Sequence, residues 1–100
     1  MKPNFNLNDR VAVITGGGGA LGGCIAQSLS QSGVKIVILD LTQESAQRTV
    51  DAIEKEGGMA IGFSANVLSK KSMEDVSKEI LKKWGRIDIL LNAAGGNMPG

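Results

Sequence analysis

Short apolar runs alternate with amphipathic segments along the chain, and this pattern predicts four strands separated by three helices. The apolar runs are rich in Val, Ile and Leu and cover residues 10–15, 35–40, 59–64 and 86–92. The segments between them repeat apolar residues every three or four positions and cover residues 20–32, 43–56 and 70–84. The predicted order of elements is therefore β-α-β-α-β-α-β.

The strands read as continuous apolar runs and do not alternate with polar residues, which is typical of strands covered by helices on both faces. We therefore predict a single α/β domain over residues 1–100, a doubly wound parallel sheet with strand order 3-2-1-4. In the first helix, Leu21, Ile25 and Leu29 recur every four residues, and we expect this face to pack on the sheet. We expect Cys24, in the same helix, to be a buried structural thiol.

Composition narrows the chemistry that the chain can perform. Eleven Lys and Arg against ten Asp and Glu leave a charge near zero, and no apolar run approaches about 18 residues, so we expect neither nucleic acid nor membrane as a partner. The absence of His excludes Ser-His-Asp triads and Cys-His pairs within the chain, and we expect no metal site. One Cys cannot form an internal disulfide, so we expect a cytoplasmic protein.

A glycine-rich loop between the first strand and the first helix is the strongest local motif. Residues 15–23 read Thr-Gly-Gly-Gly-Gly-Ala-Leu-Gly-Gly and contain the dinucleotide pattern G-x-G-x-x-G. The start of a helix presents free N–H groups and a positive dipole end, which suit a pyrophosphate. A glycine-rich turn without a ligand is the alternative. The residues predicted to contact the cofactor here are Gly16, Gly18, Gly19, Ala20, Leu21 and Gly22.

Asp40 ends the second strand eighteen residues after Gly22, close to the spacing expected of an acid that binds a ribose. Its carboxylate could accept hydrogen bonds from both ribose hydroxyls and would repel a 2′-phosphate. The glycine loop carries no Lys or Arg, and Leu41 follows the acid. We therefore predict NAD as the cofactor, with NADP less favoured. The alternative is that Asp40 only caps the loop before the next helix.

The ends of the third and fourth strands should line the same crevice, because ligands of open parallel sheets bind at the carboxyl ends of the strands. Asn66 and Val67 follow the third strand, and Asn66 could bond an adenine edge or could be a simple turn residue. The segment after the fourth strand could line the crevice or form a flexible tail. Its predicted site residues are Asn92, Ala93, Ala94 and Gly95.

Taken together, these motifs resemble the short-chain dehydrogenase/reductase family from about Leu7 onward. The likeness has four parts: Thr15, Gly16 and Gly22 with Ala20 in place of a glycine, the acid Asp40, the pair Asn66-Val67, and Asn92-Ala93-Ala94-Gly95. It implies a Rossmann-type fold, incomplete here, and an NAD(P)-dependent dehydrogenase or reductase that moves a hydride between NAD and a hydroxyl or keto substrate. Residues 15–23 and 92–99 further resemble the D-mannonate (fructuronate) oxidoreductase subgroup, which implies a sugar acid as the small-molecule substrate.

The family's catalytic Tyr-x-x-x-Lys motif has no match in the chain, which contains no Tyr. We therefore expect no catalytic residue in this chain, which would form the cofactor-binding N-terminal half of a longer, homo-oligomeric enzyme and would be inactive alone. A non-catalytic nucleotide-binding module that is complete at Gly100 is the alternative. A flavodoxin-like signalling domain is a weaker alternative, because such domains lack this glycine loop.

Overall fold

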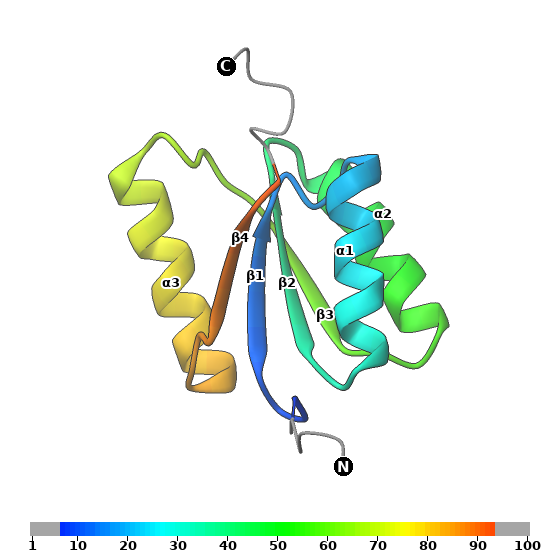
Figure 1. Ribbon diagram of the computed structural model, residues 1–100. Coiled ribbons are helices and arrows are strands. Elements are labelled where there is room, and N and C mark those ends of the chain that lie inside the picture. Colours follow the sequence, from blue (N-terminus) through cyan, green and yellow to red (C-terminus); the bar gives the residue numbers. More distant parts are fainter. Residues whose placement is uncertain (1–6, 94–100) are drawn as a thin grey trace.

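The computed structural model describes residues 7–93, which form one parallel sheet with helices on both faces (Figure 1). The sheet order is β3-β2-β1-β4, so the predicted α/β class and the predicted order 3-2-1-4 are both confirmed. The elements in chain order are β1 (Val11–Thr15), α1 (Ala20–Gln31), β2 (Lys35–Asp40), α2 (Gln43–Lys55), β3 (Ala60–Ser64), α3 (Lys70–Trp84) and β4 (Ile89–Asn92).

All three strand pairings are parallel, so the four strands end at the same edge of the sheet. Thr15 at the end of β1 is paired with Leu39 of β2 and with Asn92 of β4. Asp40, the last residue of β2, is paired with Ser64, the last residue of β3. The loops that carry the predicted site residues therefore leave the sheet side by side (Figure 1).

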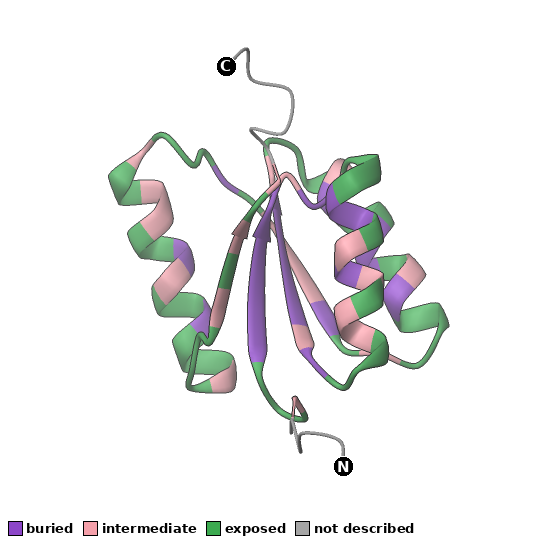
Figure 2. Cartoon of the chain, viewed as in Figure 1, coloured by how far each residue is buried: buried purple, intermediate pink, exposed green. Residues whose placement is uncertain are grey.

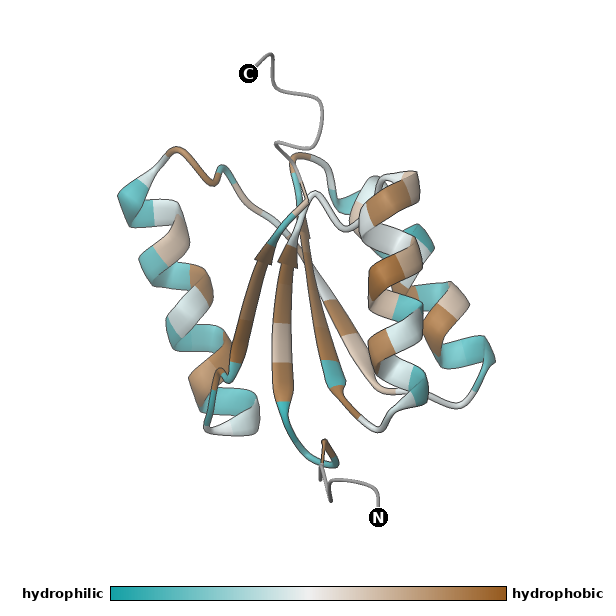
Figure 3. Ribbon diagram, viewed as in Figure 1, coloured by the Kyte–Doolittle hydropathy of each residue, from teal (hydrophilic) through white to brown (hydrophobic). Residues whose placement is uncertain are grey.

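Successive residues of the central strands supply two separate cores, because side chains of a strand alternate between faces. Ala12 and Ile14 of β1 pack with α1 and α2, whereas Val11 and Val13 pack with α3. Burial is greatest in β1 and β2 (Figure 2), and apolar residues concentrate in the strands (Figure 3). This arrangement explains why the strand sequences are apolar without alternation.

The observed elements differ from the predicted ones mainly at their ends. Four begin or end one residue inside the prediction, a difference typical of frayed termini. The larger difference is in the fourth strand, which begins at Ile89 and not at residue 86. Arg86 and Asp88 instead form a surface ion pair at 2.8 Å, and the Asp88 carboxylate also accepts a hydrogen bond from Val11 N at 2.9 Å. This polar turn delays the start of the strand.

For the first helix, the expectation of a buried Cys24 was wrong, and the expectation of a packed apolar face was wrong for Leu21 only. Leu21 is 59% exposed, and Cys24 is also exposed. The buried residues of α1 are Gly22, Gly23 and Ala26, because the helix packs closely through its small residues. Ile25 and Leu29 are partly buried and pack against the core, so the predicted apolar face is confirmed for these two residues. Leu21, at the start of the helix, does not belong to it.

None of the helices in residues 7–93 is both long enough and apolar enough to cross a lipid bilayer. In the same residues, no group of three or more His, Cys, Asp or Glu side chains is arranged to hold a metal ion.

Candidate functional site

A cleft of about 500 Å³ lies at the carboxyl edge of the sheet, where the loops after all four strands meet. Its walls bring together many of the residues predicted from separate motifs, as the sheet order requires. The predicted residues that line it are Gly16, Gly18, Gly19, Asp40, Leu41, Asn66, Val67 and Ala93. The expected convergence of strand ends is therefore present in the structure.

Glycine is needed in the loop after β1 for two different physical reasons. Gly16 has a φ of +69°, a left-handed conformation, and its N–H donates to Leu39 O at 2.7 Å. Gly22 lies in the first turn of α1 directly over the loop. A Cβ atom on Gly22 would lie 2.5 Å from Gly16 O and 2.8 Å from Gly17 Cα, both backbone atoms. The loop and the helix can approach this closely only because Gly22 has no side chain.

The N-terminus of α1 differs from those of the other two helices. Thr42 caps α2 by accepting a hydrogen bond from Ser45 N, and Ser69 caps α3 by accepting one from Ser72 N. At α1 the cap residue is Gly19, and no side-chain hydrogen bond caps the helix within the described residues. No acidic residue lies in its first turn. The first amides of α1, with the positive dipole end, are therefore suited to an anion.

The Asp40 carboxylate is held over the glycine loop by three donors. Its Oδ2 accepts hydrogen bonds from Gly18 N and from Ser45 Oγ, both at 3.0 Å. Its Oδ1 accepts one from Leu41 N at 2.8 Å. The bond from Leu41 N fits the alternative that Asp40 caps the loop before α2, and the bond from Gly18 N links Asp40 to the glycine loop as well. Oδ2 already accepts two hydrogen bonds, whereas Oδ1 accepts one and keeps a second lone pair. The carboxylate can therefore still accept a hydrogen bond from a ligand in the cleft through Oδ1.

The remaining walls of the cleft are partly apolar. Leu41 is 72% exposed and Val67 is 38% exposed, and both border the cleft. Asn66 turns the chain between β3 and α3, because its Oδ1 accepts a hydrogen bond from Leu68 N at 2.9 Å. Exposed apolar side chains beside a polar loop form a surface that suits a flat heterocycle.

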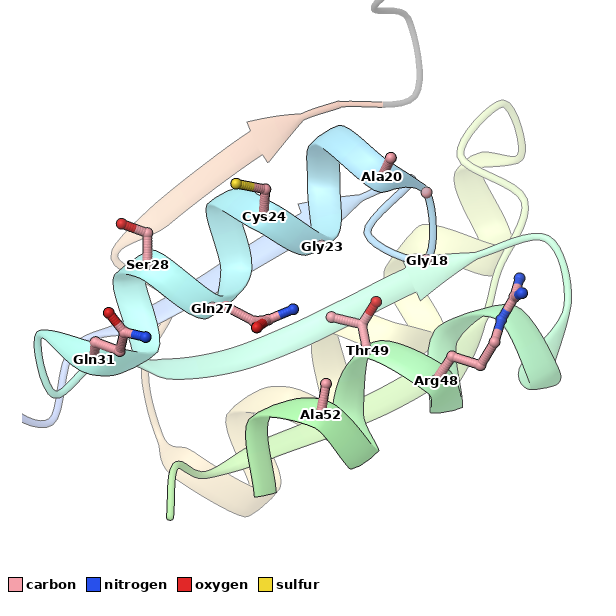
Figure 4. A pocket seen from close by; sticks show the side chains of 11 residues that line it. Gly18, Ala20, Gly23, Cys24, Gln27, Ser28, Gln31, Arg48, Thr49 and Ala52 are labelled. Carbon is pink, nitrogen blue, oxygen red and sulfur yellow. The ribbon is translucent and has the colours of Figure 1, made fainter. Parts of the chain in front are cut away.

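The other predicted residues lie around the cleft. Leu21 is exposed on α1, and Gly22 is buried under the loop. Asn92 Oδ1 accepts a hydrogen bond from Thr15 Oγ1 at 2.9 Å and so joins the ends of β1 and β4. Ala20 lines a neighbouring groove (Figure 4). Ala94 and Gly95 lie outside the described residues.

The cleft is also lined by residues that lie outside the sequence motifs. Ser45 and Arg48 contribute from α2, and the others are Leu39, Ala65 and Leu68. Arg48 is exposed and is the cation among the lining residues of the described chain. The helical spacing of Ser45 and Arg48 does place them on neighbouring positions of one face. The contact of this face with the glycine loop depends on the tertiary structure and cannot be predicted from the spacing alone.

A second hollow, of about 550 Å³, runs between α1 and α2 (Figure 4). It shares Gly18, Gly19 and Arg48 with the cleft. Cys24 borders it from α1, which agrees with the exposed position of the thiol. The two helices are therefore not sealed against each other along their length.

Comparison with known proteins gives relatives for almost the whole chain. The chain is 43% identical to the uncharacterized oxidoreductase UxuB of Bacillus subtilis, and the match covers 94% of this chain and 34% of that protein. It is 32% identical to the 7alpha-hydroxysteroid dehydrogenase of Escherichia coli K12, over 96% of this chain and 38% of that protein. The chain thus spans about a third of the length of these curated relatives.

Solved structures show the same arrangement. A candidate D-mannonate oxidoreductase from Haemophilus influenzae, solved with bound NAD, superimposes with a TM-score of 0.87 at 37% identity, over 94% of this chain and 34% of that chain. An NAD⁺-bound xylitol dehydrogenase gives a TM-score of 0.81 at 26% identity, over 86% and 33% of the respective chains. The family model for short chain dehydrogenases matches residues 10–100. This chain therefore belongs to the short-chain dehydrogenase/reductase family.

Proposed function

We propose that this chain is the cofactor-binding part of an NAD-dependent oxidoreductase that acts on a hydroxyl or keto substrate. The observation that carries the proposal is the Asp40 carboxylate, which lines the cleft while bonded to Gly18 N of the glycine loop at 3.0 Å. An acid beside a phosphate-binding loop is the arrangement that accepts an adenosine ribose. Bound NAD would supply the hydride acceptor, and the protein would supply binding and orientation.

The residues present fit such a cofactor. The uncapped amides of α1 suit a pyrophosphate, and a Cβ atom added to Gly19 would meet only Gly16 O, at 3.5 Å, so the backbone there stays open to a ligand. The apolar walls suit the adenine. We assign to the site Gly16, Gly18, Gly19, Ala20, Leu21, Gly22, Asp40, Leu41, Asn66, Val67, Asn92, Ala93, Ala94 and Gly95.

The preference for NAD over NADP is tested by isothermal titration of the full chain with both cofactors. Asp40→Ala should weaken NAD roughly tenfold, because hydrogen bonds to a charged acceptor are lost. It should also reduce the discrimination against NADP, since the charge that opposes a 2′-phosphate is gone. Asp51→Ala is the matched control, because Asp51 is an exposed acid on α2 that accepts a hydrogen bond from Gln47 and does not line the cleft. Unchanged binding of both cofactors by Asp40→Ala would contradict the ribose role.

We further propose a sugar acid as the substrate of the full-length protein, which we expect to be a cytoplasmic homo-oligomer. The support for the substrate is the similarity to the Haemophilus influenzae protein named above, which is described as a D-mannonate oxidoreductase candidate. The test follows NADH formation by the full-length protein with D-mannonate and, in parallel, with a 7α-hydroxysteroid. Faster turnover of the steroid would contradict the sugar-acid proposal.

A further inference from the structure

Two hydroxyl groups on α2 contact the glycine loop and its acid from outside the sequence motifs. Thr49 Oγ1 donates a hydrogen bond to Gly17 O at 2.7 Å. One turn earlier on the same helix, Ser45 Oγ donates to Asp40 Oδ2 at 3.0 Å. A single face of α2 is therefore bonded both to the loop after β1 and to the end of β2.

These contacts meet at one peptide unit. The Gly17 carbonyl and the Gly18 N–H belong to the same planar peptide bond. The carbonyl accepts from Thr49, and the N–H donates to the Asp40 oxygen that Ser45 also holds. Rotation of this peptide plane would break both hydrogen bonds at once. The orientation of the Gly17–Gly18 peptide is thus set by side chains from two other elements.

The packing around this peptide leaves little room for adjustment. A Cβ atom on Gly18 would collide with Ser45 Oγ and would lie 2.5 Å from Asp40 Oδ2. A Cβ atom on Gly23 would lie 3.4 Å from Thr49 Oγ1. Thr49 is only 6% exposed and points from α2 toward α1 (Figure 4). Helix α2 therefore packs directly against the loop, and the buried Thr49 hydroxyl makes one of the hydrogen bonds between them.

We propose that Ser45 and Thr49 are positioning residues for dinucleotide binding, an inference that rests on the proposed function. Thr49 orients the Gly17–Gly18 peptide beside the pyrophosphate position, and Ser45 holds Asp40 Oδ2, so that the carboxylate is fixed with its Oδ1 available at the ribose position. Glycine-rich backbone has many accessible conformations. Holding one of them before the ligand arrives removes an ordering cost that binding would otherwise carry.

The test titrates the full chain with NAD, NADP, ADP and adenosine by calorimetry. Thr49→Val keeps the shape of the side chain and removes its hydroxyl, so it should weaken NAD and ADP roughly tenfold and adenosine much less. Thr49→Ser keeps the hydroxyl and should bind close to wild type. Ser45→Ala acts at the ribose end, and it should lower the ratio of NAD to NADP affinity roughly threefold.

Val50→Ala is the control for a merely structural effect. Val50 is a buried core residue of α2, 3% exposed, and its truncation should lower the melting temperature without changing the ratios between ligands. If Val50→Ala shifts those ratios as the hydroxyl variants do, the positioning role is overturned. It is also overturned if wild type binds NAD and both hydroxyl variants bind every ligand as wild type does. If wild type binds no dinucleotide, the proposed function itself fails, and the inference with it.

Discussion

At the scale of single residues, the glycines of the loop differ in whether the structure has room for a methyl side chain. A Cβ atom on Gly22 would meet backbone atoms of Gly16 and Gly17 at 2.5 and 2.8 Å, whereas one on Gly19 would make ordinary contact at 3.5 Å. Gly22→Ala should therefore lower the free energy of unfolding by about 1–3 kcal/mol, a typical cost of overpacking. Urea denaturation measures this loss.

Gly19→Ala is the matched comparison, because it adds the same methyl group in the same loop, at the residue directly before α1. Gly19 has a φ of −80°, which any residue adopts, so its stability should change by less than about 0.5 kcal/mol. Equal losses of stability in the two variants would show that the close approach of loop and helix at Gly22 is not what requires glycine there.

The position of Asp40 in the cleft was predictable, since its place at the end of an apolar run and its distance from the glycines are visible in the sequence. Its three hydrogen-bond donors were not, because Gly18 and Ser45 reach it from other elements. Cys24 shows the opposite case. Its exposure depends on how α1 is rotated on the sheet, and the residue type alone does not show on which side of the helix a single cysteine lies.

At the scale of elements, one carboxylate joins the start of β1 to the turn before β4. Arg86 donates two hydrogen bonds of 2.8 Å to Asp88, and Val11 N donates another at 2.9 Å. These donors lower the pKa of Asp88 from 3.8 to about 2. The carboxylate therefore stabilises the fold above the pKa of the unfolded chain, and this contribution is lost as the pH falls from about 4 toward 2.

Asp88→Asn should therefore lower the urea midpoint at pH 6, and the difference from wild type should disappear near pH 2. Unfolding curves measured at intervals across that range check the expectation. Asp75→Asn is the control, because Asp75 forms an exposed pair with Lys71 at 3.9 Å, a kind of contact that contributes little. A difference between Asp88→Asn and wild type that persists unchanged at pH 2 would exclude this ionisation as its source.

At the scale of the whole molecule, β4 is the more exposed of the two edge strands, β3 and β4, of the sheet within residues 7–93. There β4 pairs with β1, and Leu90 in its middle is 64% exposed. Exposed apolar strand edges promote pairing between chains, and charged side chains oppose it. We expect the 100-residue chain, expressed alone, to self-associate as its concentration rises, and Leu90→Lys to reduce this association.

Sedimentation velocity over a range of concentrations measures the effect. Leu81→Lys is the matched control, since Leu81 is 48% exposed but lies on helix α3. If both substitutions reduce association equally, general surface hydrophobicity is responsible and the strand edge has no special role.

The order of elements, the parallel sheet and the glycine-rich loop motif are determined by the sequence itself, because they depend on local periodicity and on residues close together in the chain. Only the tertiary structure brings Ser45, Arg48 and Thr49 of α2 against the glycine loop. These contacts depend on how a helix is rotated and seated on a sheet. The rotation and position of a helix on a sheet follow from the packing of many side chains at once, so they cannot be predicted from a short segment of sequence.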